Sequence, residues 1–239
     1  MPHVHPTPRH AVLKSWARAR NRGPREVAGG LLTRLGENVA SDNALLFLAR
    51  PATRAQPSAA GVSFFVASGD DGRRYARDIG TESPATFAAR LGPHTSCFLS
   101  ADGERLLHAS WVTTCAAWTR ELRRYVRPPA GSAYVYESYT SPAARGRGIY
   151  PAALRSMGSW LTERGLQRMW VAVEEDNPPS LRAVTKAGFT EQFVVRYARR
   201  AGRLKIELPA EHLIVGWRLT RRAPLSGACV GFTLDPADG

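Results

Sequence analysis

Two glycines alternate with two arginines in residues 144–151, which read ARGRGIYP. A strand-like run, 133–140, precedes this stretch, and a helix-like run, 152–164, follows it. A glycine-rich turn at a helix N-terminus presents free backbone N–H groups and partial positive charge to one point, which suits a phosphate. We therefore expect this turn to hold the phosphates of a cofactor. By itself it matches neither a P-loop nor a dinucleotide fingerprint, so a solvated turn is the competing reading.

Two side chains near this turn are candidates for acid–base chemistry. Glu137 lies in the strand that leads to the turn, where it could act as a general base or simply face solvent as a strand-edge charge. His108 stands in an otherwise apolar run and belongs to the residue type that titrates near neutrality. A histidine hydrogen-bonded inside the core is the alternative for His108, and it is the more common case.

The elements that must position these residues can be read from hydrophobic patterns and turn residues. Ser83-Pro84 predicts a helix start with Phe87 and Leu91 on one face, and Asp102-Gly103 predicts a hairpin turn. Residues 116–126 are expected to form a loop or a short helix. Strands are expected at 43–49, 62–67, 96–100, 105–113, 133–140, 169–173, 189–199, 203–207 and 212–219, and further helices at 27–35, 152–164 and from about 178 to Gly188.

Composition describes an ordinary globular protein with one unusual feature, its charge. The 239 residues carry a net charge of +13, yet only three of the 33 basic residues are lysines. Scattered arginines are a weak argument for nucleic-acid binding, and a phosphate-bearing small-molecule partner is the preferred explanation of the positive charge.

The three cysteines form no C-x-x-C pair, which argues against a disulfide framework or a zinc cluster and favours a reducing, cytoplasmic compartment. The longest apolar run is too short to span a membrane.

Residues 97–189 resemble the GNAT superfamily of acyl-CoA-dependent N-acyltransferases. The phosphate-binding signature of that family reads Arg/Gln-x-x-Gly-x-Gly/Ala, and Arg145, Gly148 and Tyr150 stand at its three specified positions. The family commonly shows an Asn, a small residue and a helix ending in Gly-Phe about thirty residues later. Asn177, Ser180 and the pair Gly188-Phe189 follow this order.

The resemblance implies acetyl-CoA, or another acyl-CoA, as co-substrate, and no metal. In the family two neighbouring strands splay apart, and their unpaired backbone groups bind the pantetheine arm. Asn177 and Ser180 would contact the far side of the pantetheine or the adenosine. The strand groups would come from Ser138, Tyr139 and Thr140, and the pyrophosphate amides from Arg145, Gly146, Arg147, Gly148, Ile149 and Tyr150.

Two departures from the family pattern concern the chemistry. Tyr150 stands where Gly or Ala is preferred, which is tolerable if its ring points away from the cofactor. Many members carry a tyrosine that protonates the departing thiolate, and the matching position here is Val184, which has no proton to give. Another group, or water, would have to serve, or the protein only binds the cofactor.

We expect an α/β fold with a mixed, mostly antiparallel central sheet flanked by helices on both faces. Residues 1–26 are expected to be a basic tail, 27–221 one GNAT-like domain, and 222–239 a C-terminal tail. Within the domain, 27–82 would cover the acceptor side and 83–221 would form the core. The expected activity is transfer of an acyl group, in the first instance acetyl, from acyl-CoA to a small-molecule or peptide amine by direct attack. A non-catalytic CoA-binding protein and a basic nucleic-acid-binding module are the alternatives. No membrane partner is expected, and a homodimer is left open.

Overall fold

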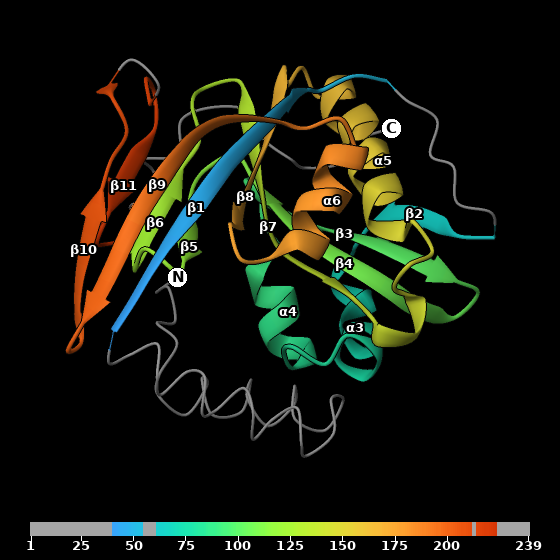
Figure 1. Ribbon diagram of the computed structural model, residues 1–239. Helices are drawn as coiled ribbons and strands as arrows, with labels where there is room; N and C mark the ends of the chain where they lie inside the picture. The colour runs from blue at the N-terminus through green and yellow to red at the C-terminus, as the bar shows by residue number, and fades with distance from the viewer. Residues whose placement is uncertain (1–39, 55–60, 212–213, 224–239) are drawn as a thin grey trace.

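A twisted eight-stranded sheet forms the centre of the protein (Figure 1). The computed structural model describes residues 40–54, 61–211 and 214–223. Neighbouring strands are antiparallel with one exception, the parallel pair β7–β8. In spatial order the strands are β10 (Arg203–Glu207), β9 (Thr190–Arg200), β1 (Ala40–Pro51), β8 (Arg168–Glu174), β7 (Ser132–Thr140), β4 (Arg105–Thr113), β3 (Thr95–Asp102) and β2 (Ser63–Val66).

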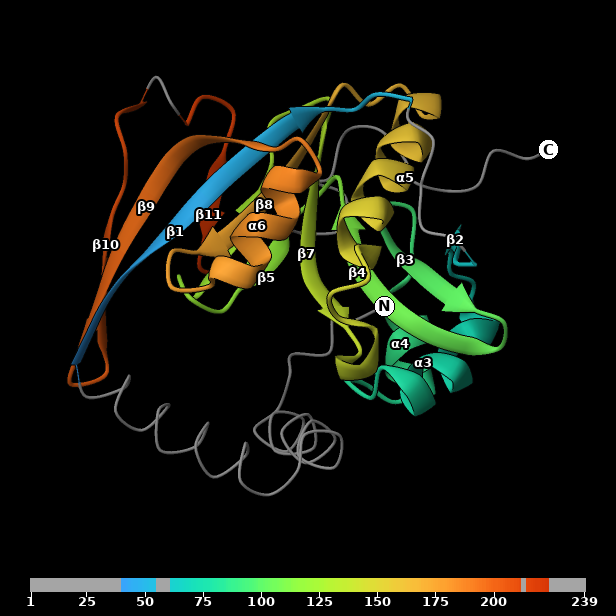
Figure 2. The same ribbon diagram turned by 45° about the vertical axis from the view of Figure 1, so that its right-hand side comes forward.

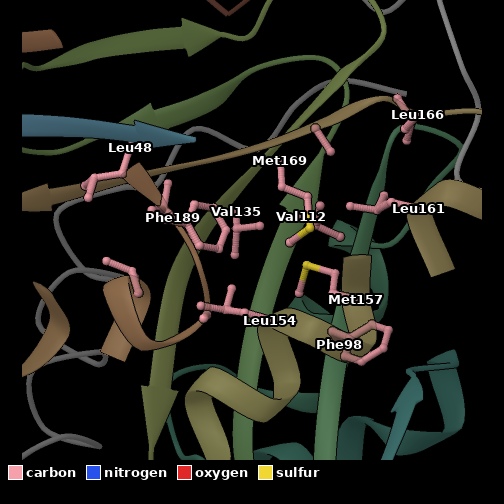
Figure 3. Close-up of a cluster of buried hydrophobic side chains, with 14 of the residues drawn as sticks. Leu48, Phe98, Val112, Val135, Leu154, Met157, Leu161, Leu166, Met169 and Phe189 are labelled. Carbon is pink, nitrogen blue, oxygen red and sulfur yellow. The ribbon is translucent and has the colours of Figure 1, made fainter. Parts of the chain in front are cut away.

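Helices α5 (Ile149–Glu163) and α6 (Pro178–Lys186) lie side by side over one face of this sheet, as both ribbon views show (Figures 1 and 2). The inner side of α5 is fully apolar: Leu154, Met157 and Leu161 are buried completely. They point into a cluster with sheet residues that include Val112, Val135 and Met169 (Figure 3). Burying such a helix face is the main source of stability for a helix of this length.

The opposite face of the sheet is covered by two separate structures. Helices α3 (Gly72–Asp78) and α4 (Pro84–Arg90) pack Tyr75 and Phe87 against Trp111 of β4. Farther along, Trp217 packs edge-on against Phe47 and Trp170 beside a small three-stranded sheet. That sheet has the order β11 (Arg218–Thr220), β6 (Arg124–Arg127) and β5 (Ala117–Thr119). The prediction of helices on both faces of a mostly antiparallel sheet is therefore confirmed.

Turn chemistry in the sequence placed several elements correctly. The Ser83 hydroxyl accepts a hydrogen bond from the amide of Thr86 and caps α4, as predicted. The hairpin at Asp102-Gly103 joins β3 and β4, and Gly103 adopts a φ of 54° there. Gly165, at φ 75°, ends α5 as expected. Each of these signals is local, so it does not depend on the rest of the fold.

Residues 116–126 contain the strands β5 and β6, so the expectation of a loop or a short helix there was wrong. Helix α3 was not foreseen. The strand β1, expected within an N-terminal extension, lies inside the sheet between β8 and β9. Cys97 is a free, buried thiol, whereas Cys115 is disulfide-bonded, which goes against the interpretation of the cysteine pattern as that of a reducing compartment.

The predicted tail 1–26, the predicted helix 27–35 and all but the first two residues of the predicted tail 222–239 lie outside the described residues. The small helices η1 (Gly69–Asp71) and η2 (Pro142–Ala144) complete the described elements. Among the helices of the described segments, none combines the length and the apolarity needed to cross a bilayer.

Phe87 offers a test of the packing that holds α4 in place. Its ring is fully buried, 4.4 Å from Tyr75 and 5.4 Å from Trp111 between ring centroids. Replacing it by alanine opens a cavity, so we expect Phe87→Ala to lower the free energy of unfolding by about 3–5 kcal/mol in urea denaturation. Ala89→Ser, at an exposed position of the same helix, is the control and should change it by less than about 0.5 kcal/mol.

Candidate active site at the parting of two strands

The parallel strands β7 and β8 pair over only four residues and then separate. Their ladder runs from Ser132 opposite Arg168 to Val135 opposite Val171, although β7 continues to Thr140 and β8 to Glu174. Beyond Val135, β7 keeps its pairing with β4 on the other side as far as Thr140. Residues 136–140 thus have one backbone edge that is not paired with β8. This is the splayed edge that the resemblance places at Ser138, Tyr139 and Thr140.

A β-bulge lies on this open edge. Trp111 of β4 pairs with Tyr136 and Ala109 pairs with Tyr139, so Ser110 alone faces the two residues Glu137 and Ser138. Glu137 adopts a φ of 48°, which is unusual for a residue with a side chain. An extra residue in one strand re-aims the side chains that follow it. As a result Tyr136 packs on the α3–α4 face, whereas the Ser138 hydroxyl bonds to Ser110 on the α5 face.

The turn between β7 and α5 has the features of an anion site. Gly146 and Gly148 adopt φ values of 79° and 73°, and Gly148 stands directly before the first residue of the 15-residue helix α5. Within the described part of the chain, the amides of Gly146, Arg147 and Gly148 donate to no backbone carbonyl. Free amides and a helix N-terminus converge here, which is the arrangement that binds phosphate. Arg145 and Arg147 flank it with half-exposed or exposed side chains, and Arg147 lies 3.4 Å from Asp102.

Glu137 is held by an arginine. Its carboxylate accepts a hydrogen bond of 2.9 Å from Arg90 of α4, and 45% of its side chain is exposed. Arg90 also pairs with Glu82, whose side chain is fully buried, and its guanidinium lies 3.8 Å from the centre of the Trp111 ring. An arginine partner favours the ionised carboxylate that a general base requires, but it also weakens that base.

His108 is fully buried and faces hydroxyl groups rather than an open cleft. Its Nδ1 lies 2.8 Å from Thr140 Oγ1, and its Nε2 lies 2.8 Å from Ser110 Oγ. Burial lowers the pKa of His108 to about 3, so the imidazole is neutral at physiological pH. The competing reading of a core histidine describes this geometry better than that of a general base exposed to substrate.

Tyr150 turns its ring inward from the turn. The ring stacks on His108 with centroids 5.1 Å apart, and burial raises the pKa of its phenol. A ring held against His108 agrees with the condition set for a bulky residue at the Gly/Ala position of the signature. Val184 of α6 is fully buried in the cluster beneath α5 and α6 and offers no polar atom.

Asn177 and Ser180 form the N-terminal cap of α6. The Asn177 side-chain oxygen accepts a hydrogen bond from the Ser180 amide at 3.3 Å, and the Asn177 side chain is exposed.

The acidic side chains at the end of β8 are bonded to neighbouring residues. Tyr197 donates to Glu174 at 2.7 Å, burial raises the pKa of Glu174, and Asn43 donates to Asp176. Glu174 and Asp176 are therefore each bonded to a neighbouring side chain.

The comparison with known families agrees with this geometry. Residues 76–189, just under half of the chain, match the model of the acetyltransferase (GNAT) family. This segment is a GNAT-family domain. It includes β3 to β8 with the turn, α5 and α6, so it contains both of the strands that part. No curated protein matches the sequence.

Several solved structures of acetyltransferases are similar to the GNAT domain and its surroundings. A putative GNAT acetyltransferase from Novosphingobium aromaticivorans is 17% identical, with a TM-score of 0.45, over 66% of this chain and 63% of its own. A GCN5-related N-acetyltransferase from Sphaerobacter thermophilus is 14% identical, with a TM-score of 0.47, over 73% of this chain and 58% of its own. An aminoglycoside acetyltransferase from a soil metagenome, in complex with sisomicin, is 10% identical, with a TM-score of 0.43, over 53% and 87%. The chain thus spans less than two thirds of the first two proteins.

The structure brings the turn, Ser138, Tyr150 and His108 together, and it adds two residues that the sequence analysis missed. Ser110 could have been found, because residues two apart on a strand share a face and His108 precedes it by two. Arg90 had no such signal. Its hydrogen bond to Glu137 joins residues that are 47 positions apart in the sequence, so it depends on how α4 packs on the sheet.

The buried His108 makes a specific prediction about acid stability. Its pKa is about 3 in the folded protein and near 6.5 when unfolded, so below pH 6.5 the unfolded chain binds the proton more readily. Stability contributed by this group is therefore lost as the pH falls from 6.5, by about 1.4 kcal/mol per pH unit. We expect His108→Phe to make the fall in unfolding free energy between pH 6.5 and 4.5 shallower by that amount, measured by urea denaturation.

A destabilising change without a titrating group is the control for this measurement. Met157→Ala should lower the whole curve of stability against pH without altering its slope, because it removes only apolar contacts. Equal slopes in the wild type and His108→Phe would show that His108 is not buried as a neutral group.

Proposed function

We propose that this protein is an N-acyltransferase that moves an acyl group, in the first instance acetyl, from acyl-CoA to an amine by direct attack. The single observation that carries the proposal is the parting of β7 and β8 directly before a turn with free amides. The GNAT family match over the same strands supports it. A plain solvated turn would need no unpaired strand edge beside it.

The residues present fit a CoA molecule. The turn amides of residues 145–150 and the N-terminus of α5 would hold the pyrophosphate, and the open edge of β7 at residues 138–140 would hold the pantetheine arm. Asn177 and Ser180, at the N-terminus of α6, would contact the pantetheine or the adenosine. Bound in this way, acyl-CoA would supply the thioester at the bulge, where backbone N–H groups could polarise its carbonyl.

The acceptor amine must lose a proton before or during attack, since an ammonium group is not nucleophilic. We propose Glu137 as the base, acting directly or through a water molecule, because its half-exposed carboxylate lies at the bulge. Arg90 would hold that carboxylate in position. The acceptor itself is left as a small-molecule or peptide amine.

The second candidate function is CoA binding without turnover. It is favoured by Val184, which leaves α6 without a proton donor, and by the arginine that weakens Glu137 as a base. A melting-temperature measurement with millimolar CoA, followed by assay of thiol release from acetyl-CoA with a panel of amines, separates the two. An unmoved melting curve would reject both functions, because a ligand specific for the native state must stabilise it.

A cytoplasmic location remains a prediction from the sequence, and the bonded Cys115 argues against a strongly reducing compartment.

The turn can be tested with a matched pair of charge substitutions. Gly146→Asp places a carboxylate among the proposed phosphate amides, at φ 79° and with open space around the new side chain. We expect the CoA dissociation constant, measured by calorimetry, to rise at least about tenfold through charge repulsion. Gly202→Asp adds the same charge at φ 77°, also in open space, in the distant β9–β10 turn. It should leave CoA binding within about twofold.

Glu137 can be tested independently of cofactor binding. In Glu137→Gln the side chain keeps its size and a partner for Arg90 but loses its basicity, so turnover should fall by about 100-fold or more. The CoA dissociation constant should stay within about twofold. An unchanged rate constant for thiol release would remove Glu137 as the base while leaving the acyltransferase proposal intact.

A further inference from the structure

The small three-stranded sheet has one face that points away from the protein core. Successive side chains of a strand lie on opposite faces of its sheet. The inward-facing set packs into the core cluster that contains Trp217, and it consists of Ala117 of β5, Val126 of β6 and Leu219 of β11. Trp118, Tyr125 and Thr220 stand in register with one another at the alternate positions. These three residues therefore lie on the outer face.

Two aromatic rings occupy the middle of this outer face. The side chain of Trp118 is 43% exposed, although tryptophan is a residue that proteins usually bury. Its ring meets the ring of Tyr125 edge-on, with the two centroids 5.1 Å apart. Tyr125 is itself half-buried rather than enclosed. The pair thus offers solvent an aromatic surface on which a flat group can stack.

Arginines lie at both ends of the aromatic pair. At one end Arg127 of β6 and Arg218 of β11 stand directly opposite each other. At the other end the turn between β5 and β6 carries Arg120 and Arg123, which are both exposed. The strands β5, β6 and β11 lie within the described chain and contain no acidic residue, and Glu121 of the turn is paired with Arg120. The outer face is therefore positively charged as well as aromatic.

We propose that this outer face binds single-stranded nucleic acid, with bases stacked on Trp118 and Tyr125 and phosphates held by the flanking arginines. Aromatic rings interleaved with basic side chains on an open sheet face hold single strands in this way, because every base has a face that can stack. This surface needs neither acyl-CoA nor the residues of the candidate active site.

Charge and ring chemistry together select this partner over two others. An acidic peptide could satisfy the arginines, but its carboxylates would leave the two rings without a stacking partner. A duplex stacks its bases on one another, so their faces are not available to Trp118. The arginines of this face are spread over positions 120 to 218 of the sequence, and the pairing of β6 with β5 and β11 brings them together.

Binding can be measured by fluorescence anisotropy with labelled oligouridylate and oligothymidylate of about 12 nucleotides, at about 50 mM salt. We expect the full-length protein to bind at least one of these strands, and the tighter of the two identifies RNA or DNA as the source. A DNA duplex of the same length should bind at least about tenfold more weakly. No binding of either strand would overturn the proposal, as would equal affinity for strand and duplex.

Trp118 provides the test of stacking. Trp118→Ala should weaken binding of the strand by about tenfold, whereas Trp118→Phe keeps an aromatic ring and should stay within about threefold. Melting curves of both variants show that they fold. Wild-type affinity in a folded Trp118→Ala protein would overturn the proposal. Displacement of the strand by an equal concentration of polyglutamate would also overturn it, because the face would then recognise charge alone.

Arg218 provides the test of phosphate contact. Arg218→Ala should weaken binding and make the slope of log affinity against log salt concentration shallower by about 0.7, the value for one phosphate contact on a single strand. Arg73→Ala removes an equally exposed arginine from α3 and is the matched control, with an unchanged slope and an affinity within about twofold. Equal slopes in Arg218→Ala and Arg73→Ala would overturn the assignment of the phosphates to this face.

Discussion

The short parallel ladder between β7 and β8 is the constraint on which the candidate site depends. Each strand is fixed on its outer side along most of its length, β8 by antiparallel pairing with β1 and β7 by pairing with β4. The cluster beneath α5 holds Val135 and Val171 together where the two strands do pair. Past that point β7 and β8 have no ladder pairing with each other. A strand edge without a partner strand leaves backbone N–H and C=O groups unpaired, and the proposed pantetheine arm would pair with them.

The strand β1 makes this arrangement possible, although it lies outside the matched GNAT segment. It bridges β8 and β9, and without it the sheet would end at β8 on that side. Segments far apart in the chain therefore complete one sheet, with residues 40–51 joining strands that begin after residue 167.

Because of the bulge at Glu137, charged side chains lie on one face of β7 and uncharged polar side chains lie on the other. On the α4 face, Arg90 joins Glu137 and the buried Glu82 above the ring of Trp111. On the α5 face, the hydroxyls of Thr140, Ser110 and Ser138 form a hydrogen-bonded chain with a neutral histidine, His108. One extra residue in a strand is enough for this division, because it reverses the alternation of side chains.

The sequence by itself determined the local features: the glycine turn, the cap at Ser83, the hairpin at Asp102-Gly103 and the apolar face of α5. These depend on a few neighbouring residues, whose backbone preferences hold in any context. The order of the motifs also identified the family and drew attention to Tyr150. Glu137 and His108 were chosen as candidates by residue type and by their place in the predicted strands. Only the tertiary structure decided what those side chains do. Arg90 reaches Glu137 because α4 packs on the sheet, and His108 is neutral because neighbouring strands and Tyr150 bury it. Protonation states and long-range partners are set by packing, and hydrophobic patterning along the chain does not encode them.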